Sequence, residues 1–267
     1  DAAPATTADE SLEPVKIGVI TWQSGALKDY GDTGLAGAQF AAHEINEAGG
    51  ILGGRPIELT VYEEGTTVEV ISQSVREAVA DGMVGLVGPN DATAVTAAFQ
   101  VASDLGIPIV GAGGGSGKTL GPDGLGRPGV VHVLGYVEAA YPGIVDYAKD
   151  MGVGSVAQVA FDSVYSTTAE TFFRQNWNDE TGVEFHDSIY LPYDASSART
   201  ELTKASAWDP DMMLVHMWGG IIVDVLKTLD ELGYDVGSKP AIQANHAMLH
   251  SEMRAAGEAA DGFMVTD

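Results

Sequence analysis

A glycine-rich segment is the strongest candidate for chemistry in this sequence. Residues Ala112 to Thr119, AGGGSGKT, depart from the phosphate-binding pattern G-x-x-x-x-G-K-[ST] only at the first position, and they follow a predicted strand. A phosphate loop must lead directly into a helix whose amino end faces the phosphates, whereas Gly121 and Pro122 interrupt any helix here. A P-loop-like nucleotide-binding enzyme is therefore a distant alternative, and a flexible glycine loop beside a ligand site is the favoured interpretation.

Metal and hydrolytic chemistry have weaker support. His246 and His250 have the spacing of zinc ligands on a helix, and His216 could lie nearby, but the pair lacks the glutamate of H-E-x-x-H. Asp162 and Ser163 could join a histidine in a hydrolytic triad, yet there is no G-x-S-x-G elbow. The sequence has no cysteine, which removes disulfides and thiolate metal ligands. We predict no catalytic residues, no metal and no cofactor.

The elements that must position any site alternate between strand and helix. Val15 to Ile20 is a short β-branched run typical of a buried parallel strand, and a polar loop over 21–31 follows it. Asp32 or Thr33 is expected to cap the first helix, which Gly49 and Gly50 end. Further strands are predicted at 57–61, 83–87, 107–110, 130–134, 155–161, 184–191, 212–216, 241–243 and 262–266. Further helices are predicted over 68–79, up to 105, and at 139–151, 167–178, 196–207, 220–232 and 248–256.

This alternation predicts an α/β fold made of two doubly wound Rossmann-like lobes joined by a hinge near 133–137. The predicted parts are a disordered N-terminal tether (1–14), a first lobe (15–134), a second lobe (135–261) and a hinge segment crossing back towards the first lobe (262–267). Open parallel sheets bind ligands beyond the carboxyl ends of their strands. The informative loops are therefore those at 21–31, 88–93, 111–117, 162–165, 217–219 and 244–247.

Composition excludes some partners. The sequence of 267 residues is 45% hydrophobic, which suits one large or two medium domains. Its 38 acidic and 13 basic residues give a formal charge of −25. Nucleic acids and anionic membranes bind clustered Lys and Arg, so neither is expected as a partner, and the acidic residues are expected on a solvated surface that would suit salty surroundings. With no apolar run long enough to span a bilayer, the chain is expected to be a mature or trimmed soluble form.

An ordered set of short segments resembles type I periplasmic binding proteins, in particular the substrate-binding subunits of branched-chain amino-acid ABC transporters. The set comprises Ser24-Gly25, Tyr30-Gly31-Asp32, Gly37-Ala38, Glu44-Ile45-Asn46, Ala48 to Ile51, Gly88-Pro89, Gly106 to Ile109, Phe161-Asp162 with Tyr165, and 257–266. The resemblance implies a Venus-flytrap fold in an extracytoplasmic, periplasmic monomer that is tethered through its N-terminus or free, binds a small molecule and serves a membrane permease. A ligand-sensing domain of a receptor is the alternative. Usual members continue beyond the 262–266 strand, so the C-terminal part of the family fold is expected to be missing.

The resemblance also implies the site. Tyr30 falls where the family places an aromatic residue against the ligand side chain, Tyr165 and Trp218 fall where the second lobe supplies aromatic residues, and Trp22 lies near the mouth. Where the amino-acid-binding branch uses two hydroxyl residues and a glutamate, this sequence has Ala92, Gly115 and Asn245. An unmatched ammonium in a closed site loses a charge-assisted hydrogen bond worth about 1.5–3 kcal/mol, so α-amino acids are not expected as ligands.

A ligand with an apolar or aromatic body and one polar end fits what remains. Backbone N–H groups at 113–116 and at the helix after Gly88 could bind a carboxylate or carbonyl oxygen, and Asn245 and His246 could donate or accept. We therefore predict an aromatic or aliphatic carboxylate, an amide or a urea-like compound. The predicted ligand-binding residues are Trp22, Tyr30, Asn90, Asp91, Ala92, Gly113, Gly115, Ser116, Tyr165, Trp218, Asn245 and His246.

Overall fold

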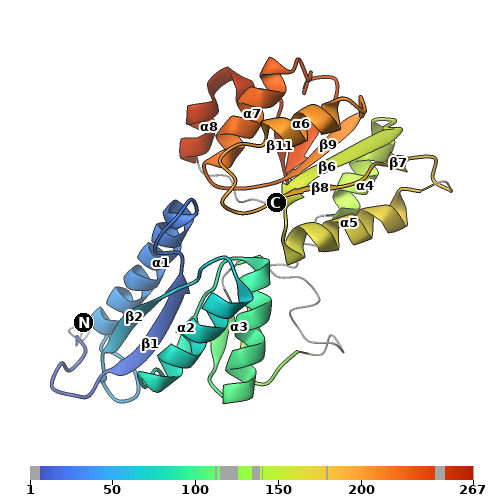
Figure 1. The fold of residues 1–267 in the computed structure, drawn as a ribbon. Helices are drawn as coiled ribbons and strands as arrows, with labels where there is room; N and C mark the ends of the chain where they lie inside the picture. Colours follow the sequence, from blue (N-terminus) through green and yellow to red (C-terminus); the bar gives the residue numbers. More distant parts are fainter. Residues whose placement is uncertain are drawn as a thin grey trace, which may run out of the picture. The chain divides into compact units, whose positions relative to one another are not determined.

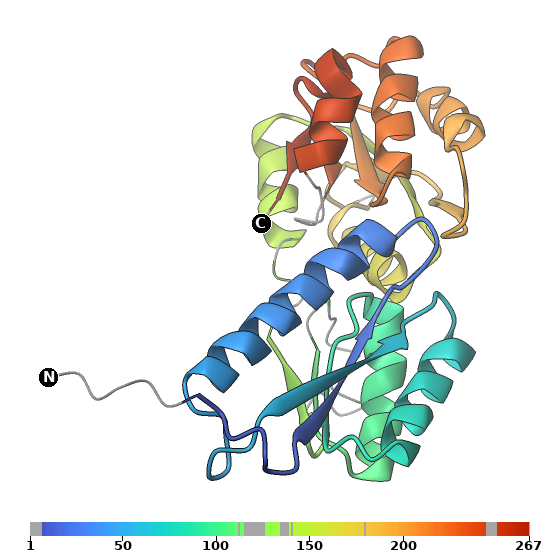
Figure 2. The same ribbon diagram turned by 90° about the vertical axis from the view of Figure 1, so that its left-hand side faces the viewer.

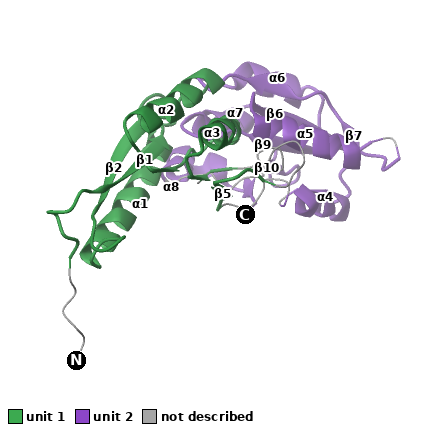
Figure 3. Ribbon diagram, turned by 90° about the horizontal axis from the view of Figure 1, so that it is seen from below, with its two compact units in different colours: residues 1–135 green, residues 136–267 purple. Residues whose placement is uncertain are grey.

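The computed structural model describes residues 7–111, 113–114, 126–133, 139, 141–178, 180–243 and 250–266. The chain forms two compact units, residues 1–135 and 136–267, which Figure 3 shows in separate colours. Each unit has its own parallel sheet with helices on both faces (Figure 1).

Unit 1 begins with the strand predicted at the start of the chain and continues as strand, helix, strand. Its elements are β1 (Val15–Thr21), α1 (Lys28–Glu47), β2 (Ile57–Glu63), α2 (Val68–Ala80), β3 (Gly85–Val87), α3 (Ala92–Leu105), β4 (Ile109–Gly111) and β5 (Val130–His132). The strands pair in the order β2-β1-β3-β4-β5, all parallel. Because crossovers between parallel strands are right-handed, this order places α1 on one face and α2 and α3 on the other, as Figure 2 shows.

Local signals explain the helices on the core side of unit 1. The Thr67 side chain accepts a hydrogen bond from Val70 N and caps α2, and the Asp91 side chain caps α3. Gly106, in the left-handed conformation, ends α3. The buried positions of α2, Ile71, Ser74, Val75 and Ala78, recur every three or four residues and face the sheet.

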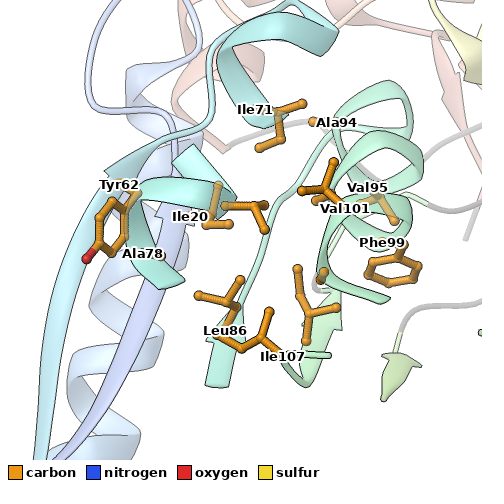
Figure 4. Close-up of a cluster of buried hydrophobic side chains, with 14 of the residues drawn as sticks. Ile20, Tyr62, Ile71, Ala78, Leu86, Ala94, Val95, Phe99, Val101 and Ile107 are labelled. Atoms are coloured by element: carbon orange, nitrogen blue, oxygen red, sulfur yellow. The ribbon is translucent and has the colours of Figure 1, made fainter. Parts of the chain in front are cut away.

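The core of unit 1 lies between the sheet and these two helices (Figure 4). Ile20 from β1 and Leu86 from β3 pack with Ile71 from α2 and with Val95 and Phe99 from α3. All five side chains are almost completely buried, and burying each stabilises the fold by about 1.5–3 kcal/mol. This packing fixes the edge of the sheet from which the functional loops emerge.

Unit 2 repeats the strand order of unit 1. Its elements are α4 (Tyr141–Asp150), β6 (Ser155–Phe161), α5 (Val164–Asn176), β7 (Glu184–Phe185), β8 (Ile189–Leu191), α6 (Arg199–Ser206), β9 (Met212–His216), α7 (Ile221–Glu231), β10 (Ala241–Gln243), α8 (His250–Ala256), a 3-10 helix (Gly257–Ala260) and β11 (Met264–Val265). β7 pairs with the first half of β6 and β8 with its second half. The sheet order is therefore β7/β8-β6-β9-β10-β11, which matches β2-β1-β3-β4-β5 strand for strand.

The α/β class and the alternation of strands and helices are confirmed, with differences at particular positions. The strand predicted over 184–191 is interrupted between Phe185 and Ile189, so that one edge strand becomes two. Helix α1 begins at Lys28 rather than after Asp32, and its N-cap position, Leu27, makes no side-chain cap. Residues 264–265, predicted as a strand in a hinge segment, pair with β10 inside the sheet of unit 2.

The N-terminal segment differs from the predicted disordered tether in its described part. Ala8 N donates to Asn46 O at 2.6 Å and Asp9 N donates to Gly54 O at 2.7 Å. The Arg55 guanidinium group donates to Glu13 O at 2.6 Å and to Pro14 O at 3.0 Å. These bonds hold the segment before β1 against unit 1, and composition alone gave no signal for them. Among the described residues, no helix is long and apolar enough to cross a membrane.

Candidate functional site

A buried carboxyl group lies at the carboxyl edge of the unit 1 sheet. Glu64 directly follows β2 and has no exposed surface. Its Oε1 accepts hydrogen bonds from Asn90 N at 2.9 Å and Asp91 N at 2.7 Å, and its Oε2 accepts one from Asn90 Nδ2 at 2.9 Å. Asn90 Nδ2 also donates to Thr21 Oγ1, at the end of β1, at 3.3 Å. Glu64 therefore connects the ends of three strands.

The charged side chains in this network are acidic, and no lysine or arginine among the described residues bonds to Glu64. Burial raises the pKa of Glu64 to about 8, the N–H donors from Asn90 and Asp91 oppose this shift, and the Asp91 carboxylate adds to it. Asp91 Oδ1 accepts from Thr93 N at 2.8 Å and from Ala94 N at 3.2 Å, so Asp91 occupies the amino end of α3. A free anion would meet this carboxylate rather than open N–H groups.

The loop after β4 is bonded to the same network. Gly113 N donates to Pro89 O and Gly114 N donates to Asn90 O, each at 3.1 Å, and His132 Nε2 lies 2.7 Å from Gly113 O. A Cβ added to Gly113 would lie 1.6 Å from Asn90 O, so only glycine fits there. We expected the amides of 113–116 to bind a carboxylate. Those of Gly113 and Gly114 are instead engaged within unit 1.

Two aromatic site residues were predicted in unit 1: Tyr30 lies in helix α1, and Trp22 lies beneath that helix. Tyr30 is in the first turn of α1, not in a loop, and is half-buried. Trp22 is buried, and its Nε1 donates to Gly65 O at 2.9 Å. Gly31 allows α1 to approach this point, because a Cβ there would lie 1.9 Å from Trp22 O. Trp22 thus holds the loops after β1 and β2 together.

Unit 2 carries a cluster of aromatic side chains at the carboxyl edge of its sheet. Trp218, after β9, packs edge-on against Phe161 at 5.3 Å, Tyr165 at 5.9 Å and Tyr193 at 5.8 Å between ring centroids. Phe161 ends β6, Tyr165 lies in the first turn of α5, and Tyr193 follows β8. The structure therefore brings Tyr165 and Trp218 together as predicted neighbours. The sequence analysis did not select Phe161 and Tyr193 as site residues, although each lies at or just after the carboxyl end of a strand.

A buried histidine lies under this cluster. The His216 ring meets the Tyr165 ring edge-on at 5.2 Å, and neither ring nitrogen has a hydrogen-bond partner among the described residues. Burial lowers the pKa of His216 to about 3, so the ring is neutral at ordinary pH. Ser163, considered for a hydrolytic triad, caps α5 by accepting from Ser166 N at 3.1 Å. No group of three or more metal-binding side chains occurs within the described ranges.

The structure divides the predicted site residues among three groups. Trp22, Tyr30, Asn90, Asp91, Ala92 and Gly113 belong to the carboxyl edge of unit 1 or to α1, and Tyr165 and Trp218 belong to the carboxyl edge of unit 2. Gly115, Ser116, Asn245 and His246 lie outside the described residues, as does most of the AGGGSGKT segment. Glu64 is the central residue that the sequence analysis did not identify.

Comparison with known proteins places this chain in a family. A family model described as Periplasmic binding protein matches residues 14–267, and the chain belongs to that family. It is a type I periplasmic binding protein, related to the branched-chain amino-acid group, and the family comprises extracytoplasmic solute-binding proteins of ABC transporters rather than enzymes. Among curated proteins, the sequence finds no match.

Solved structures show the same fold at low sequence identity. The leucine-binding protein LivK from Thermotoga maritima has a TM-score of 0.79 at 18% identity, covering 95% of this chain and 69% of that protein. A solute-binding protein of an ABC transporter from Rhodopseudomonas palustris, in complex with 3,4-dihydroxybenzoic acid, has a TM-score of 0.73 at 19% identity and coverages of 86% and 61%. Another from R. palustris, in complex with 4-hydroxybenzoate, gives 0.73 at 16% identity and coverages of 86% and 61%. The chain thus spans about two thirds of the length of these proteins.

Proposed function

We propose that this chain is the extracytoplasmic solute-binding component of an ABC transporter, which captures a small organic solute between its two units and delivers it to a membrane permease. The two units would close by a hinge around 133–137 and 262–267. A ligand that bridges both units would favour the closed form in proportion to the extra contacts that it makes there. The protein would act as a monomer, and no cofactor enters this function.

The observation that carries this proposal is the matched architecture of the two units. Both sheets have the same strand order, so each has one carboxyl edge where ligand-binding loops emerge. In unit 1 that edge is polar, with Asn90 and Asp91 at the amino end of α3. In unit 2 that edge is aromatic, because three other aromatic rings pack against Trp218. A solute with a polar end and an aromatic or apolar body complements the pair.

The polar end of the solute is constrained by the charges of unit 1. The loop residues 22–27, 64–67, 88–91 and 113–114 include acidic groups but no lysine or arginine. The amides of Gly113 and Gly114 are bonded within the unit, and those of Thr93 and Ala94 are capped by Asp91. Among carboxylates, amides and urea-like compounds, a neutral amide or urea-like end towards unit 1 is therefore favoured. An α-amino carboxylate remains disfavoured by Ala92 at the position of the family's hydroxyl residue.

Calorimetric titration of aromatic-cluster variants tests this function. The ligand panel contains 4-hydroxybenzamide, 4-hydroxybenzoate, urea and leucine, with circular dichroism confirming that each variant is folded. Replacing Trp218 by alanine removes the ring against which three others pack, and affinity should fall at least about tenfold. Trp208→Ala is the matched control, because Trp208 is 38% exposed and stacks on His186. Equal affinity in Trp218→Ala, Tyr165→Ala and the control would contradict the proposed site.

A ligand-sensing domain of a receptor is the second function compatible with this fold. Both functions need the same capture step, so the titrations above do not separate them. Reconstitution with a candidate permease in liposomes does: ligand uptake that depends on added binding protein supports transport, and tight ligand binding without stimulated uptake supports sensing.

A further inference from the structure

Two consecutive glutamates, Glu63 at the end of β2 and Glu64 directly after it, bond to different loops. Glu63 Oε1 accepts from Gln23 N at 3.3 Å and Glu63 Oε2 accepts from Ser24 Oγ at 3.3 Å, both in the loop after β1. Glu64 is completely buried, and its three hydrogen bonds all come from Asn90 and Asp91 in the loop between β3 and α3. The two side chains therefore restrain the loops that follow β1 and β3, the next two strands of the sheet.

The charged surroundings of Glu64 make its role unusual. Asp91, the N-cap of α3, is the carboxylate that acts on it, and Glu63 is its acidic neighbour on β2. Thr21, on β1, and Asn90 are the neutral polar groups in the same network. No lysine or arginine of the described chain bonds to Glu64. Because no ion pair offsets its burial, the three N–H donors are the interactions that retain this carboxyl group inside the unit.

Glu64 Oε1 is the acceptor for the backbone N–H groups of Asn90 and Asp91. If the carboxyl group were removed, both N–H groups would lose this buried acceptor, and the loop would have to rearrange to replace the hydrogen bonds. The change would spread to the loop after β4, because Gly113 N and Gly114 N bond to the carbonyls of Pro89 and Asn90. Glu64 thus controls both loops without being exposed to a ligand.

We propose that Glu64 is a positioning residue for solute capture: it holds loop 88–91, and through it residues 113–114, in the arrangement that presents Asn90 to Ala92 to the solute. This inference rests on the proposed function, since it assumes that the solute meets the carboxyl edge of unit 1. It identifies a residue that acts through the loop and makes no contact with the solute itself.

The test compares variants that change the carboxyl group by different amounts. Glu64→Gln keeps an acceptor for the two backbone amides and mimics the neutral acid, once the Asn90 amide turns its oxygen towards the new NH2 group. Glu64→Asp withdraws the carboxyl group by one methylene, and Glu64→Ala removes it. Glu58→Gln is the control, because Glu58 is an exposed glutamate on β2, the strand that ends just before Glu64, and its replacement removes the same charge.

The first measurement needs no ligand. In protein labelled with 15N at Asn and Asp, the amide signals of Asn90 and Asp91 should titrate together with a midpoint near pH 8 in the parent and in Glu58→Gln, in accord with the raised pKa of Glu64. They should not titrate in Glu64→Gln. The inference is overturned if these amides titrate identically in the parent and Glu64→Gln, or if they do not titrate in the parent.

The second measurement is affinity for 4-hydroxybenzamide and 4-hydroxybenzoate at pH 6.5. Glu64→Gln should remain within about threefold of the parent, whereas Glu64→Asp and Glu64→Ala should lose at least about tenfold. Parent-like affinity in Glu64→Asp and Glu64→Ala would overturn the inference, and Glu64→Asp decides the matter if Glu64→Ala does not fold. If neither compound binds the parent or Glu58→Gln, the proposed ligand class fails, while the amide titration still decides the role of Glu64.

Discussion

The buried imidazole of His216 gives a stability prediction that can be worked out from the structure. The ring has the ordinary pKa of about 6.5 in the unfolded chain and about 3 in the folded protein, because burial disfavours the charged form. Between these values the unfolded chain binds a proton that the folded protein does not. Stability is therefore complete above pH 6.5 and falls as the pH decreases towards 3.

The size of the effect follows from the shift. Each unit of pH below 6.5 costs about 1.4 kcal/mol, so the His216 contribution at pH 4.5 is a loss of about 3 kcal/mol. His216→Leu has similar volume and no titrating group. At pH 7.5 it removes two unpaired buried nitrogens, worth about 1–3 kcal/mol, and loses the edge contact with Tyr165, worth about 0.5–1.5 kcal/mol. At pH 7.5 the stability of the variant should therefore lie between about 0.5 kcal/mol below and about 2.5 kcal/mol above that of the parent.

Urea unfolding at pH 7.5 and 4.5, followed by tryptophan fluorescence, measures this difference. Three of the four tryptophans, Trp177, Trp208 and Trp218, belong to unit 2, so the signal reports the unit that contains His216. The difference in free energy of unfolding between His216→Leu and the parent should shift in favour of the variant by about 3 kcal/mol from pH 7.5 to pH 4.5. His43→Gln, at an exposed position of α1, is the control and should show no such shift. Parallel losses in the parent and His216→Leu would refute the reasoning.

Three further predictions concern glycine contacts, the cap of α3 and charge. Gly31→Ala should lower the free energy of unfolding by more than about 2 kcal/mol, because the new Cβ would lie 1.9 Å from Trp22 O. Gly37→Ala, whose Cβ would meet nothing within 4 Å, should raise it by about 0.5–1 kcal/mol. Equal effects of the two substitutions in urea unfolding would contradict this prediction. Asp91→Ala should cost about 0.5–2 kcal/mol through loss of the α3 cap, and unchanged unfolding would show that the cap is dispensable. Raising NaCl from 0.1 to 1 M shortens the Debye length from about 10 to 3 Å. Because the chain carries a formal charge of −25, this screening should reduce repulsion among acidic side chains and raise the melting temperature. A fall in melting temperature would exclude charge repulsion as the dominant effect.

Hydrophobic periodicity was sufficient to predict most of the fold. Buried runs such as Val15 to Ile20 are short, rich in β-branched residues and separated by amphipathic helices, and that pattern permits few structures other than parallel sheets with helices on both faces. The start of α1 was predicted wrongly because no side chain caps it. Asp32 and Thr33 lie within α1 rather than at its cap, and Gly31 packs closely on Trp22 O in the first turns of the helix.

The site was harder to predict because its parts are brought together by topology. Asn90 and Asp91 stand out beside a predicted turn, but their partner, Glu64, precedes them by 26 and 27 residues and looks like one more surface acid. Only the placement of β3 beside β1, and of β1 beside β2, brings the three residues together. Phe161 and Tyr193 are similar cases: both lie at or just after the end of a strand, but only packing against Trp218 distinguishes them from other residues at strand ends.

The measurement that tests the central claim most directly is a thermal-shift comparison of the parent protein with 4-hydroxybenzamide, 4-hydroxybenzoate, urea, leucine and Mg-ATP. A ligand at a hundred times its dissociation constant stabilises the bound form by about 2.7 kcal/mol, and each kcal/mol raises the melting temperature by roughly 2–4 °C at this size. We expect the melting temperature to rise with the aromatic amide or carboxylate and to stay unchanged with leucine. A shift with leucine would contradict the inference drawn from Ala92, and a shift with Mg-ATP alone would restore the phosphate loop as the functional site.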